Sequence, residues 1–212
     1  MKRKIKICGL KALDNVIEAH KHGAYWYGLI FYKKSPRNIS LKDARFIVKN
    51  SPHNIKPVAV TVDSSLRQIE NIVNTGVNTI QLHGNETIEY CNSLKTNFGV
   101  TLIKSIGVKT VSDLKLVKSY NKFVDWLLFD SKGGYMPGGT GKSFRWEIVN
   151  SFRKEKKWIL SGGLSISNIK EAIDITNAPA LDVSSGVESK LGVKSKKLIK
   201  SFCNLVKDYN GA

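Results

Sequence analysis

The chain has 212 residues, 42% of them hydrophobic and 24% charged, and its 34 Lys and Arg against 17 Asp and Glu give a formal net charge of +17. This composition excludes a disordered or fibrous chain and is typical of a globular protein with a full core. Because the sequence shows neither a membrane-spanning apolar run nor a signal peptide, we expect one cytoplasmic domain over residues 1–212 with no membrane partner.

Short runs rich in Val, Ile and aromatic residues recur along the chain, each followed by a turn signal and then by residues at helical spacing. This alternation is typical of βα units. The runs begin near Lys4, Tyr25, Pro57, Asn78, Val100, Val124, Lys157 and Ala180. Eight such units form either an open doubly wound sheet or a closed barrel. Closure removes both sheet edges and suits equal units, so we predict a single-domain (β/α)8 TIM barrel, an α/β fold.

Two segments between these strands, residues 12–23 and 65–76, carry apolar residues at helical spacing and end at a glycine, as helices commonly do. Cys91 and Cys203 lie on similar apolar stripes, so we predict that both are buried packing residues. With Cys8 they make three cysteines and no CxxC pair, which indicates neither a disulfide framework nor a metal site.

In such a barrel the active site is built from the carboxyl ends of the strands and the loops that follow them. Polar residues at these positions are therefore the candidates, in chain order Cys8, Arg37, Asp63, His83, Asp130, Ser161 and Asp182. For Asp63 a plainer interpretation is the cap of a helix that starts near Ser65.

Strand alternation places Lys6 and Cys8 on the inner side of the first strand, opposite to Ile5 and Ile7. A buried ammonium group needs a partner, and in a closed barrel the eighth strand lies beside the first. We therefore predict an ion pair between Lys6 and Asp182. The ammonium group should also lower the pKa of the Cys8 thiol from its ordinary value of about 8.5. The alternative for Cys8 is a small core residue.

Asp130 lies at the end of the sixth strand and by alternation faces inward with Leu128 and Trp126. The first and sixth strands are not neighbours, so Cys8 and Asp130 should face each other across the barrel mouth. A base and an acid on opposite sides of a substrate can move protons between two of its atoms. The glycine-rich segment 130–144 then fits a flap over the site, or a plain surface loop.

Small residues follow the last two strands, at 161–163 and 184–186. Glycine and serine let backbone N–H groups approach an anion, and barrels commonly hold a phosphate at this place. Arg37 carries a forked guanidinium group suited to a carboxylate, although a single loop arginine is often only solvated. His83 is a candidate proton donor or hydrogen-bonding wall; its alternative role is to order the turn at Gly84.

Six motifs now stand in order over nearly the whole chain: KICGL, SPR, QLHG, LLFDS with GGTGKSFRW, LSGGLSISNI and DVSSGVE. Together they resemble the phosphoribosylanthranilate isomerase family of tryptophan biosynthesis. The resemblance implies an Amadori rearrangement of N-(5-phosphoribosyl)anthranilate to 1-(2-carboxyphenylamino)-1-deoxyribulose 5-phosphate, without a metal or organic cofactor. It further implies that Cys8 is the general base and Asp130 the general acid.

The same resemblance implies roles for the other candidates. Arg37 would bind the anthranilate carboxylate, and Asp182 would bind a sugar hydroxyl. From its position at a strand end, we also place His83 among the substrate-binding residues. The phosphate would lie on the backbone at Gly162, Gly163, Ser184, Ser185 and Gly186. Two positions depart from the family pattern: Thr61 stands where Phe is usual and should loosen the mouth, and Ser195 stands where an acidic residue is usual and should loosen a helix start.

Two other classes remain as alternatives. One is a different sugar-phosphate barrel, such as the histidine-pathway isomerase, which uses an Asp pair, or indole-glycerol-phosphate synthase, which needs a Lys and Glu set that this sequence does not provide. The other is a basic RNA-binding module, because Lys and Arg neutralise phosphates. The basic residues are spread along the whole chain, so we expect no nucleic-acid partner. We further expect the protein to be a monomer or a homodimer.

Overall fold

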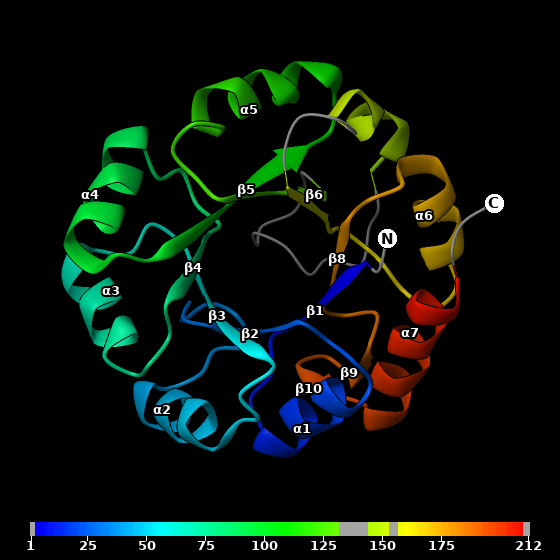
Figure 1. Cartoon of the computed structure of the whole chain (residues 1–212), viewed down its shortest axis with the longest axis horizontal. Helices are drawn as coiled ribbons and strands as arrows, with labels where there is room; N and C mark the ends of the chain where they lie inside the picture. Colours follow the sequence, from blue (N-terminus) through cyan, green and yellow to red (C-terminus); the bar gives the residue numbers. More distant parts are fainter. Residues whose placement is uncertain (1–2, 132–143, 153–156, 210–212) are drawn as a thin grey trace.

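The computed structural model of the chain describes residues 3–131, 144–152 and 157–209. Eight parallel strands form a closed barrel in sequence order, with β8 beside β1, and the helices form a ring outside it (Figure 1). The strands are β1 (Lys4–Cys8), β2 (Trp26–Ile30), β3 (Lys56–Thr61), β4 (Thr79–Leu82), β5 (Thr101–Val108), β6 (Trp126–Ser131), β7 (Trp158–Leu160) and β8 (Ala180–Val183). The predicted barrel is confirmed and the open sheet is excluded. The largest error in a predicted strand start is the shift from Val124 to Trp126.

The outer ring consists of α-helices and short 3-10 helices in the order that the βα alternation predicts. They are α1 (Leu13–Lys21), α2 (Leu41–Asn50), α3 (Leu66–Val73), α4 (Ile88–Phe98), η1 (Val111–Leu114), α5 (Lys115–Tyr120), η2 (Trp146–Phe152), α6 (Ile169–Thr176) and α7 (Lys196–Asp208). Helices α1 and α3 occupy the two predicted helical segments. None of the helices within the described residues has an apolar stretch long enough to cross a bilayer.

Polar caps fix where several helices begin. At the start of α3, Ser65 accepts a hydrogen bond from the backbone of Gln68, and the Gln68 side chain accepts one from the backbone of Ser65. At the start of α7, Ser195 accepts a hydrogen bond from the N–H of Leu198 at 3.3 Å. Serine is a favourable N-cap residue. The expectation that Ser195 loosens this helix start is therefore wrong.

The apolar side chains divide into two groups because successive residues of a strand point to opposite faces. One group fills the inside of the barrel and contains Trp26, Val58, Ile103, Leu128, Ile159 and Ala180. The other, much larger group packs the outer face of the strands against the helices. Cys91 and Cys203 are fully buried in the outer group, which confirms their predicted packing role.

A small antiparallel hairpin of β9 (Glu188–Lys190) and β10 (Val193–Lys194) lies between β8 and α7. The strand periodicity did not predict it, because two strands this short carry no readable alternation. The hairpin places Glu188 and Lys194 next to the loop that follows β2, as the contacts below show.

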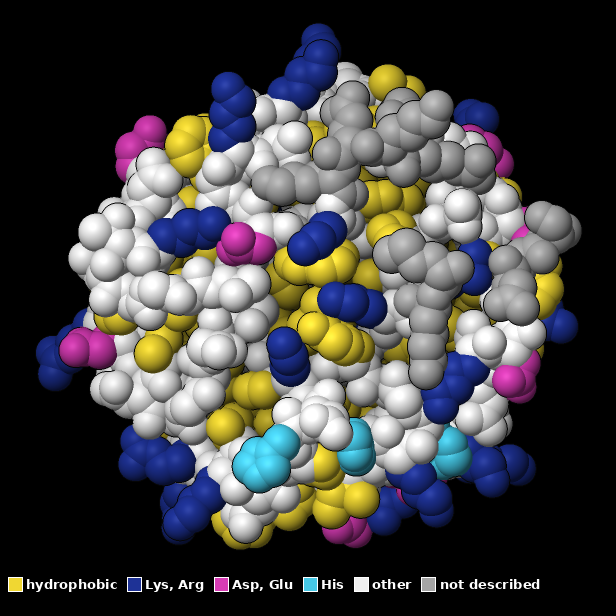
Figure 2. Space-filling view, in the orientation of Figure 1, with side chains coloured by type: hydrophobic (Ala, Val, Ile, Leu, Met, Phe, Trp, Pro, Cys, Tyr) yellow, Lys and Arg dark blue, Asp and Glu magenta, His cyan; other side chains and the backbone are white. Residues whose placement is uncertain are grey.

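Basic side chains are distributed widely over the surface. On the face shown in Figure 2, Lys and Arg side chains lie around the rim and over the centre, with few acidic ones among them. This distribution agrees with a general lysine excess over a solvated surface.

Candidate active site

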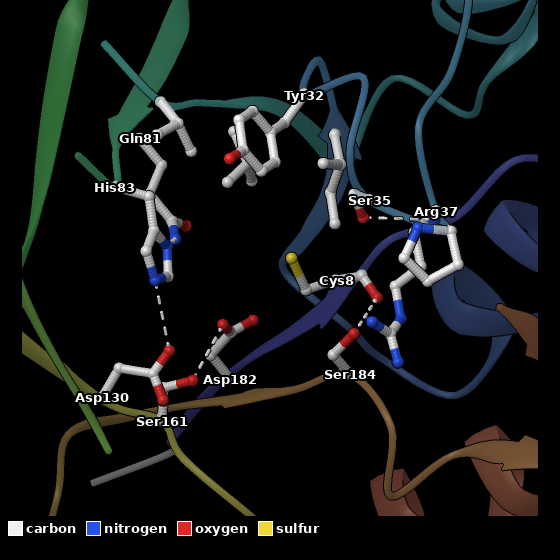
Figure 3. Close-up of a pocket in the computed structure, with 14 residues that line it drawn as sticks. Cys8, Tyr32, Ser35, Arg37, Gln81, His83, Asp130, Ser161, Asp182 and Ser184 are labelled. Atoms are coloured by element: carbon white, nitrogen blue, oxygen red, sulfur yellow. Dashed lines mark hydrogen bonds and ion pairs between the residues drawn. The ribbon is translucent and has the colours of Figure 1, made fainter. Parts of the chain in front are cut away.

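One pocket opens where the carboxyl ends of the barrel strands meet (Figure 3). It is a hollow of about 600 Å³ when the adjoining open solvent is included. Seven residues that we assigned to the site line it: Cys8, Arg37, His83, Asp130, Ser161, Asp182 and Ser184. They come from β1, β6 and β8 and from the segments that follow β2, β4, β7 and β8. The barrel therefore brings together residues that are far apart in the sequence.

Cys8 is the last residue of β1 and is buried apart from a small area at the pocket wall, with 6% of its surface exposed. Its neighbour in the register is Gly28 on β2. A Cβ atom at Gly28 would lie 2.8 Å from Cys8 Sγ, so the glycine provides the space that the thiol occupies. A glycine inside a strand often marks such a close approach. Gly28 could therefore have been recognised in the sequence, although we had not assigned it to the site.

The pKa of the Cys8 thiol is raised above its ordinary value, contrary to our expectation. Burial is the largest cause, and the nearby Lys6 and Lys194 ammonium groups offset it only in part. Burial disfavours the thiolate, and the negative charge of Asp182 disfavours it further. Together they outweigh the effect of the two ammonium groups. Burial therefore favours the neutral thiol form of Cys8 over the thiolate.

We expect iodoacetamide to modify Cys8 before the other cysteines of the folded protein, at a rate that increases with pH. Cys8 reaches the pocket, whereas Cys91 and Cys203 have no exposed surface, and the thiolate is the reactive form. Peptide mass spectrometry after timed alkylation measures the three rates. Equal modification of all three cysteines, or a Cys8 rate independent of pH, would contradict the placement.

Lys6 and Asp182 form a buried ion pair on neighbouring strands, as predicted. The Lys6 Nζ lies 2.9 Å from Asp182 Oδ1, and the two residues are paired in the register of β1 and β8. Burial alone would lower the pKa of Lys6, but the charges of Asp182 and Cys8 outweigh it and raise the pKa. The second oxygen, Asp182 Oδ2, accepts a hydrogen bond from the Ser161 hydroxyl at 3.2 Å. Asp182 is thus tied to β1 and to the segment after β7.

Asp130 lies near the end of β6, on a different side of the pocket from Cys8, with Asp182 between them in Figure 3. His83 Nε2 is 3.3 Å from Asp130 Oδ2, and His83 Nδ1 is 3.0 Å from Gln81 Nε2. The two contacts hold the His83 ring between Gln81 and Asp130. His83 therefore contacts the proposed acid directly.

Gly162, after β7, leaves room for the backbone next to Asp130. Its φ of +88° is left-handed, and a Cβ atom there would lie 2.6 Å from the N–H nitrogen of Ser131. That Ser131 N–H donates a hydrogen bond to Asp130 Oδ1 at 2.7 Å. Glycine at this position thus preserves the local geometry of the Asp130 carboxyl group.

Glu86, not His83, orders the turn at Gly84. The Gly84 N–H donates to both oxygens of the Glu86 carboxylate, and Lys104 Nζ contacts Glu86 at 2.8 Å and the Gly84 carbonyl oxygen at 2.7 Å. The sequence analysis missed this buried pair. The fifth strand carries a lysine in an apolar run, but Lys104 lies on the outer face with Leu102, opposite to the inward Ile103.

Asp63 does not cap α3, whose cap is Ser65. Instead Asp63 Oδ1 accepts a hydrogen bond from the N–H of Asn85 at 2.7 Å. It therefore joins the segments after β3 and β4 and is not among the residues that line the pocket.

Arg37 lies at the pocket edge but already has a bidentate partner. Its Nε and Nη2 atoms lie 2.6 and 2.8 Å from the two carboxylate oxygens of Glu188. Lys194 Nζ also contacts Glu188, at 2.7 Å. We call Arg37, Glu188 and Lys194 the Glu188 cluster. Arg37 is therefore not a solvated loop residue, and only part of its guanidinium group is left for a substrate.

The pKa of Glu188 is lowered to about 2. Burial acts to raise it, but hydrogen bonds from Arg37, Lys194 and the Gly192 backbone outweigh burial. A carboxyl group with a lower pKa in the folded state stabilises the protein above its unfolded pKa of about 4.3. This stabilisation is lost as the pH falls from there toward about 2.

We expect Glu188→Gln to lower the free energy of unfolding at about pH 6 and to lower it by roughly half as much near pH 3. Urea unfolding of both proteins at the two pH values measures the difference. A deficit that is constant over this range would show that the Glu188 charge is not what stabilises the cluster.

The small residues after β7 and β8 lie side by side, with Ser165 and Gly186 forming an isolated parallel bridge. No described residue accepts a hydrogen bond from the N–H groups of Gly162, Gly163, Ser184 or Ser185. Ser184 also lines the pocket, and its hydroxyl donates to the Cys8 carbonyl oxygen at 3.1 Å. The segments proposed to bind phosphate are therefore continuous with the pocket.

Most of the segment predicted as a flap, residues 132–143, lies outside the described residues. Thr61, the other departure from the family pattern, is fully buried, and its hydroxyl lies 3.4 Å from the Gln81 carbonyl oxygen. The described residues hold no group of three or more His, Cys, Asp or Glu side chains arranged to bind a metal ion.

A closed (β/α)8 barrel with a thiol and a carboxyl group in one pocket at the carboxyl ends of its strands defines an acid–base barrel enzyme. Comparison with known proteins makes the assignment specific. Residues 5–205 match the family model described as N-(5'phosphoribosyl)anthranilate (PRA) isomerase. The chain belongs to this family.

Individual relatives agree with the family model over nearly the whole chain. The N-(5'-phosphoribosyl)anthranilate isomerase of Rhizobium meliloti (strain 1021) is 40% identical over 211 residues, covering 98% of each chain. The crystal structure of phosphoribosyl anthranilate isomerase from Thermotoga maritima superposes with a TM-score of 0.89 at 34% identity and covers 97% of this chain and 99% of that one. A related structure in complex with reduced 1-(o-carboxyphenylamino)-1-deoxyribulose 5-phosphate has a TM-score of 0.86 at 33% identity, with coverages of 97% and 99%.

Proposed function

We propose that this protein converts N-(5-phosphoribosyl)anthranilate to 1-(2-carboxyphenylamino)-1-deoxyribulose 5-phosphate in tryptophan biosynthesis, with Asp130 as general acid and Cys8 as general base. The observation that carries these roles is their placement on different sides of one pocket, beside backbone N–H groups that suit a phosphate. The phosphate fixes one end of the sugar, so that the reacting carbons lie between the two side chains.

Asp130 acts first. Its carboxyl proton passes to the ribose ring oxygen, the bond from C1 to that oxygen breaks, and the anthranilate nitrogen lone pair forms a C1–N double bond. The product of this step is an open-chain iminium ion. His83 Nε2 and the Ser131 N–H contact Asp130, so they hold the carboxyl group toward the pocket and stabilise the carboxylate that remains.

Cys8 acts second, as a thiolate that removes the C2 proton. The C2–H electrons form a C1–C2 double bond, and the iminium nitrogen receives the electron pair, which gives a neutral enolamine. This intermediate then tautomerises to the ketone, with a proton added at C1 and the C2 hydroxyl proton released. The proton that Cys8 gains balances the one that Asp130 loses.

Because the pKa of Cys8 is raised in the free protein, the thiolate forms when the substrate is bound. The thiol proton then passes to solvent, and Asp130 regains a proton from solvent after the product leaves. The iminium charge supplies a reason, because an adjacent cation favours a thiolate. Lys6 adds a second positive charge on the same strand.

The other assigned residues bind the two ends of the substrate. Arg37 binds the anthranilate carboxylate and Asp182 binds a sugar hydroxyl. His83 lines the site while contacting Asp130. The backbone of Gly162, Gly163, Ser184, Ser185 and Gly186 binds the phosphate. The hydrogen bond that Asp182 shares with Ser161 can be exchanged for the sugar hydroxyl without disturbing Lys6, which uses the other oxygen.

The assembly and location of the protein belong to the same proposal. One solved relative is described as monomers generated from a dimeric isomerase of Thermotoga maritima, which supports a monomer or homodimer here. We propose that the enzyme acts in the cytoplasm, on a small-molecule substrate, with no nucleic-acid partner and no metal or organic cofactor.

The test is turnover of freshly prepared N-(5-phosphoribosyl)anthranilate by the purified protein, followed by the loss of substrate fluorescence and by identification of the ketose product. Rescue of a tryptophan auxotroph that lacks only this step provides the cellular counterpart. Product formation in buffer containing a metal chelator supports the proposal. An inactive, folded protein that retains RNA in a salt-sensitive manner would instead favour the RNA-binding alternative.

A further inference from the structure

The Glu188 carboxylate is shared among four donors, and its side chain is almost entirely buried. Oε1 is contacted by Arg37 Nε and Lys194 Nζ, at 2.6 and 2.7 Å. Oε2 is contacted by Arg37 Nη2 and the Gly192 N–H, at 2.8 and 3.1 Å. Both oxygens are therefore committed within the Glu188 cluster, which leaves little capacity to bind a substrate. Glu188 contributes through the residues it holds.

The pairing determines how Arg37 meets a ligand. Two of the three guanidinium nitrogens are bound to Glu188, and no described residue accepts a hydrogen bond from the third, Nη1. Arg37 lines the pocket and is only 3% exposed. Because the guanidinium group is planar, fixing one edge also fixes the direction of the remaining nitrogen.

Charge balance gives a second reason for a glutamate at this position. Arg37 and Lys194 are both buried cations, and Glu188 is the acidic group that both of them contact. Without its charge, two positive groups would lie close together with no counter-ion, and the long Arg37 side chain would turn toward solvent. A glutamine at this position has the same size as the glutamate but lacks the negative charge that balances the two cations.

We infer that Glu188 is a positioning residue that orients Arg37 so that its Nη1 atom meets the carboxylate of the substrate. The inference rests on the proposed function, since it assigns how that site selects a carboxylated aromatic amine. The β9–β10 hairpin thereby becomes a determinant of substrate specificity, although it lies outside the barrel strands.

A purely structural role must be distinguished from this one. Lys194 also donates to the Ser184 carbonyl and hydroxyl oxygens, and the Ser184 hydroxyl donates to the Cys8 carbonyl. Loss of Glu188 could disturb the phosphate side through this route. Such a disturbance would affect every phosphorylated substrate, whereas loss of Arg37 orientation affects only a substrate that has the carboxylate.

The experiment compares two substrates, N-(5-phosphoribosyl)anthranilate and N-(5-phosphoribosyl)aniline, which lacks the carboxylate. For Glu188→Gln we expect kcat/KM on the first substrate to fall about 10- to 100-fold, mainly through KM, as for loss of a charged hydrogen bond. On the aniline substrate we expect a change of less than about threefold. Arg37→Met should show the same selective pattern, and Asp14→Asn, which removes an exposed ion pair with Lys196, should change neither substrate.

Equal losses of kcat/KM on the two substrates would overturn the inference and show that the role of Glu188 is purely structural. Circular dichroism and urea unfolding establish that each variant is folded. Glu188→Asp, which retains the charge but shortens the side chain, is measured in the same way, and a selective loss there also supports the inference. If neither variant folds, Glu188 is required for the fold and the positioning role is rejected. Inactive wild-type protein would refute the proposed function, whereas active wild-type with unselective variants refutes this inference alone.

Discussion

Asp130→Asn and Cys8→Ser are each expected to lower kcat about 10²- to 10⁴-fold while leaving KM within a few fold, the usual contribution of a positioned acid or base. Asparagine has no acidic proton to give to the ring oxygen. A serine hydroxyl is far too weakly acidic to form the anion that removes the C2 proton. Steady-state assays with N-(5-phosphoribosyl)anthranilate measure both effects.

The double variant tests whether the two side chains act on the same substrate or whether the two substitutions impair the protein independently. If both side chains act on the same substrate, the double variant should lose less than the product of the two single losses, because each step already limits turnover when its catalyst is missing. Cys203→Ser is a matched control, since it makes the same exchange in a thiol packed in the outer core, away from the pocket. Retention of near wild-type kcat in either single variant would remove that residue from the mechanism.

Lys6→Met is expected to lower the free energy of unfolding by about 3–5 kcal/mol, the second large effect that the structure predicts. The substitution leaves the Asp182 carboxylate buried next to an apolar side chain, with the Ser161 hydroxyl as its remaining hydrogen-bond donor among the described residues. The penalty arises from the uncompensated charge, because methionine fills a similar volume. Urea unfolding near neutral pH measures it.

Lys196→Met is the matched control for this stability effect. Lys196 and Asp14 form an ion pair with a similar distance, 3.1 Å, but both side chains are more than half exposed. Exposed pairs contribute about 0–1 kcal/mol. A loss in Lys6→Met no greater than the loss in Lys196→Met would show that the barrel does not depend on this buried pair.

The strand-end rule and the period-2 alternation predicted half of the residues that line the pocket. They located Cys8, Asp130 and Asp182 because these residues lie on or at the end of regular strands, where position in the sequence determines both the face and the height in the barrel. The pairing of Lys6 with Asp182 followed from the inward position of Lys6 and from closure, which makes the eighth strand a neighbour of the first.

Contacts of residues beyond the eight barrel strands were not predictable in this way. Glu188 begins the short β9 hairpin and Glu86 follows β4, and the folded connections bring them to their partners Arg37 and Lys104. The pKa of Cys8 depends on a balance between burial and charge that only coordinates provide. In each case the sequence contained the residue but not its environment.

A kinetic isotope effect tests the roles of Asp130 as acid and Cys8 as base most directly. With substrate deuterated at C2, we expect a larger primary isotope effect on kcat in Cys8→Ser than in the wild type, because proton removal from C2 becomes fully rate-limiting. We expect an effect near unity in Asp130→Asn, where ring opening limits the rate. The opposite pattern, with the isotope effect enhanced in Asp130→Asn and abolished in Cys8→Ser, would contradict the assignment of acid and base.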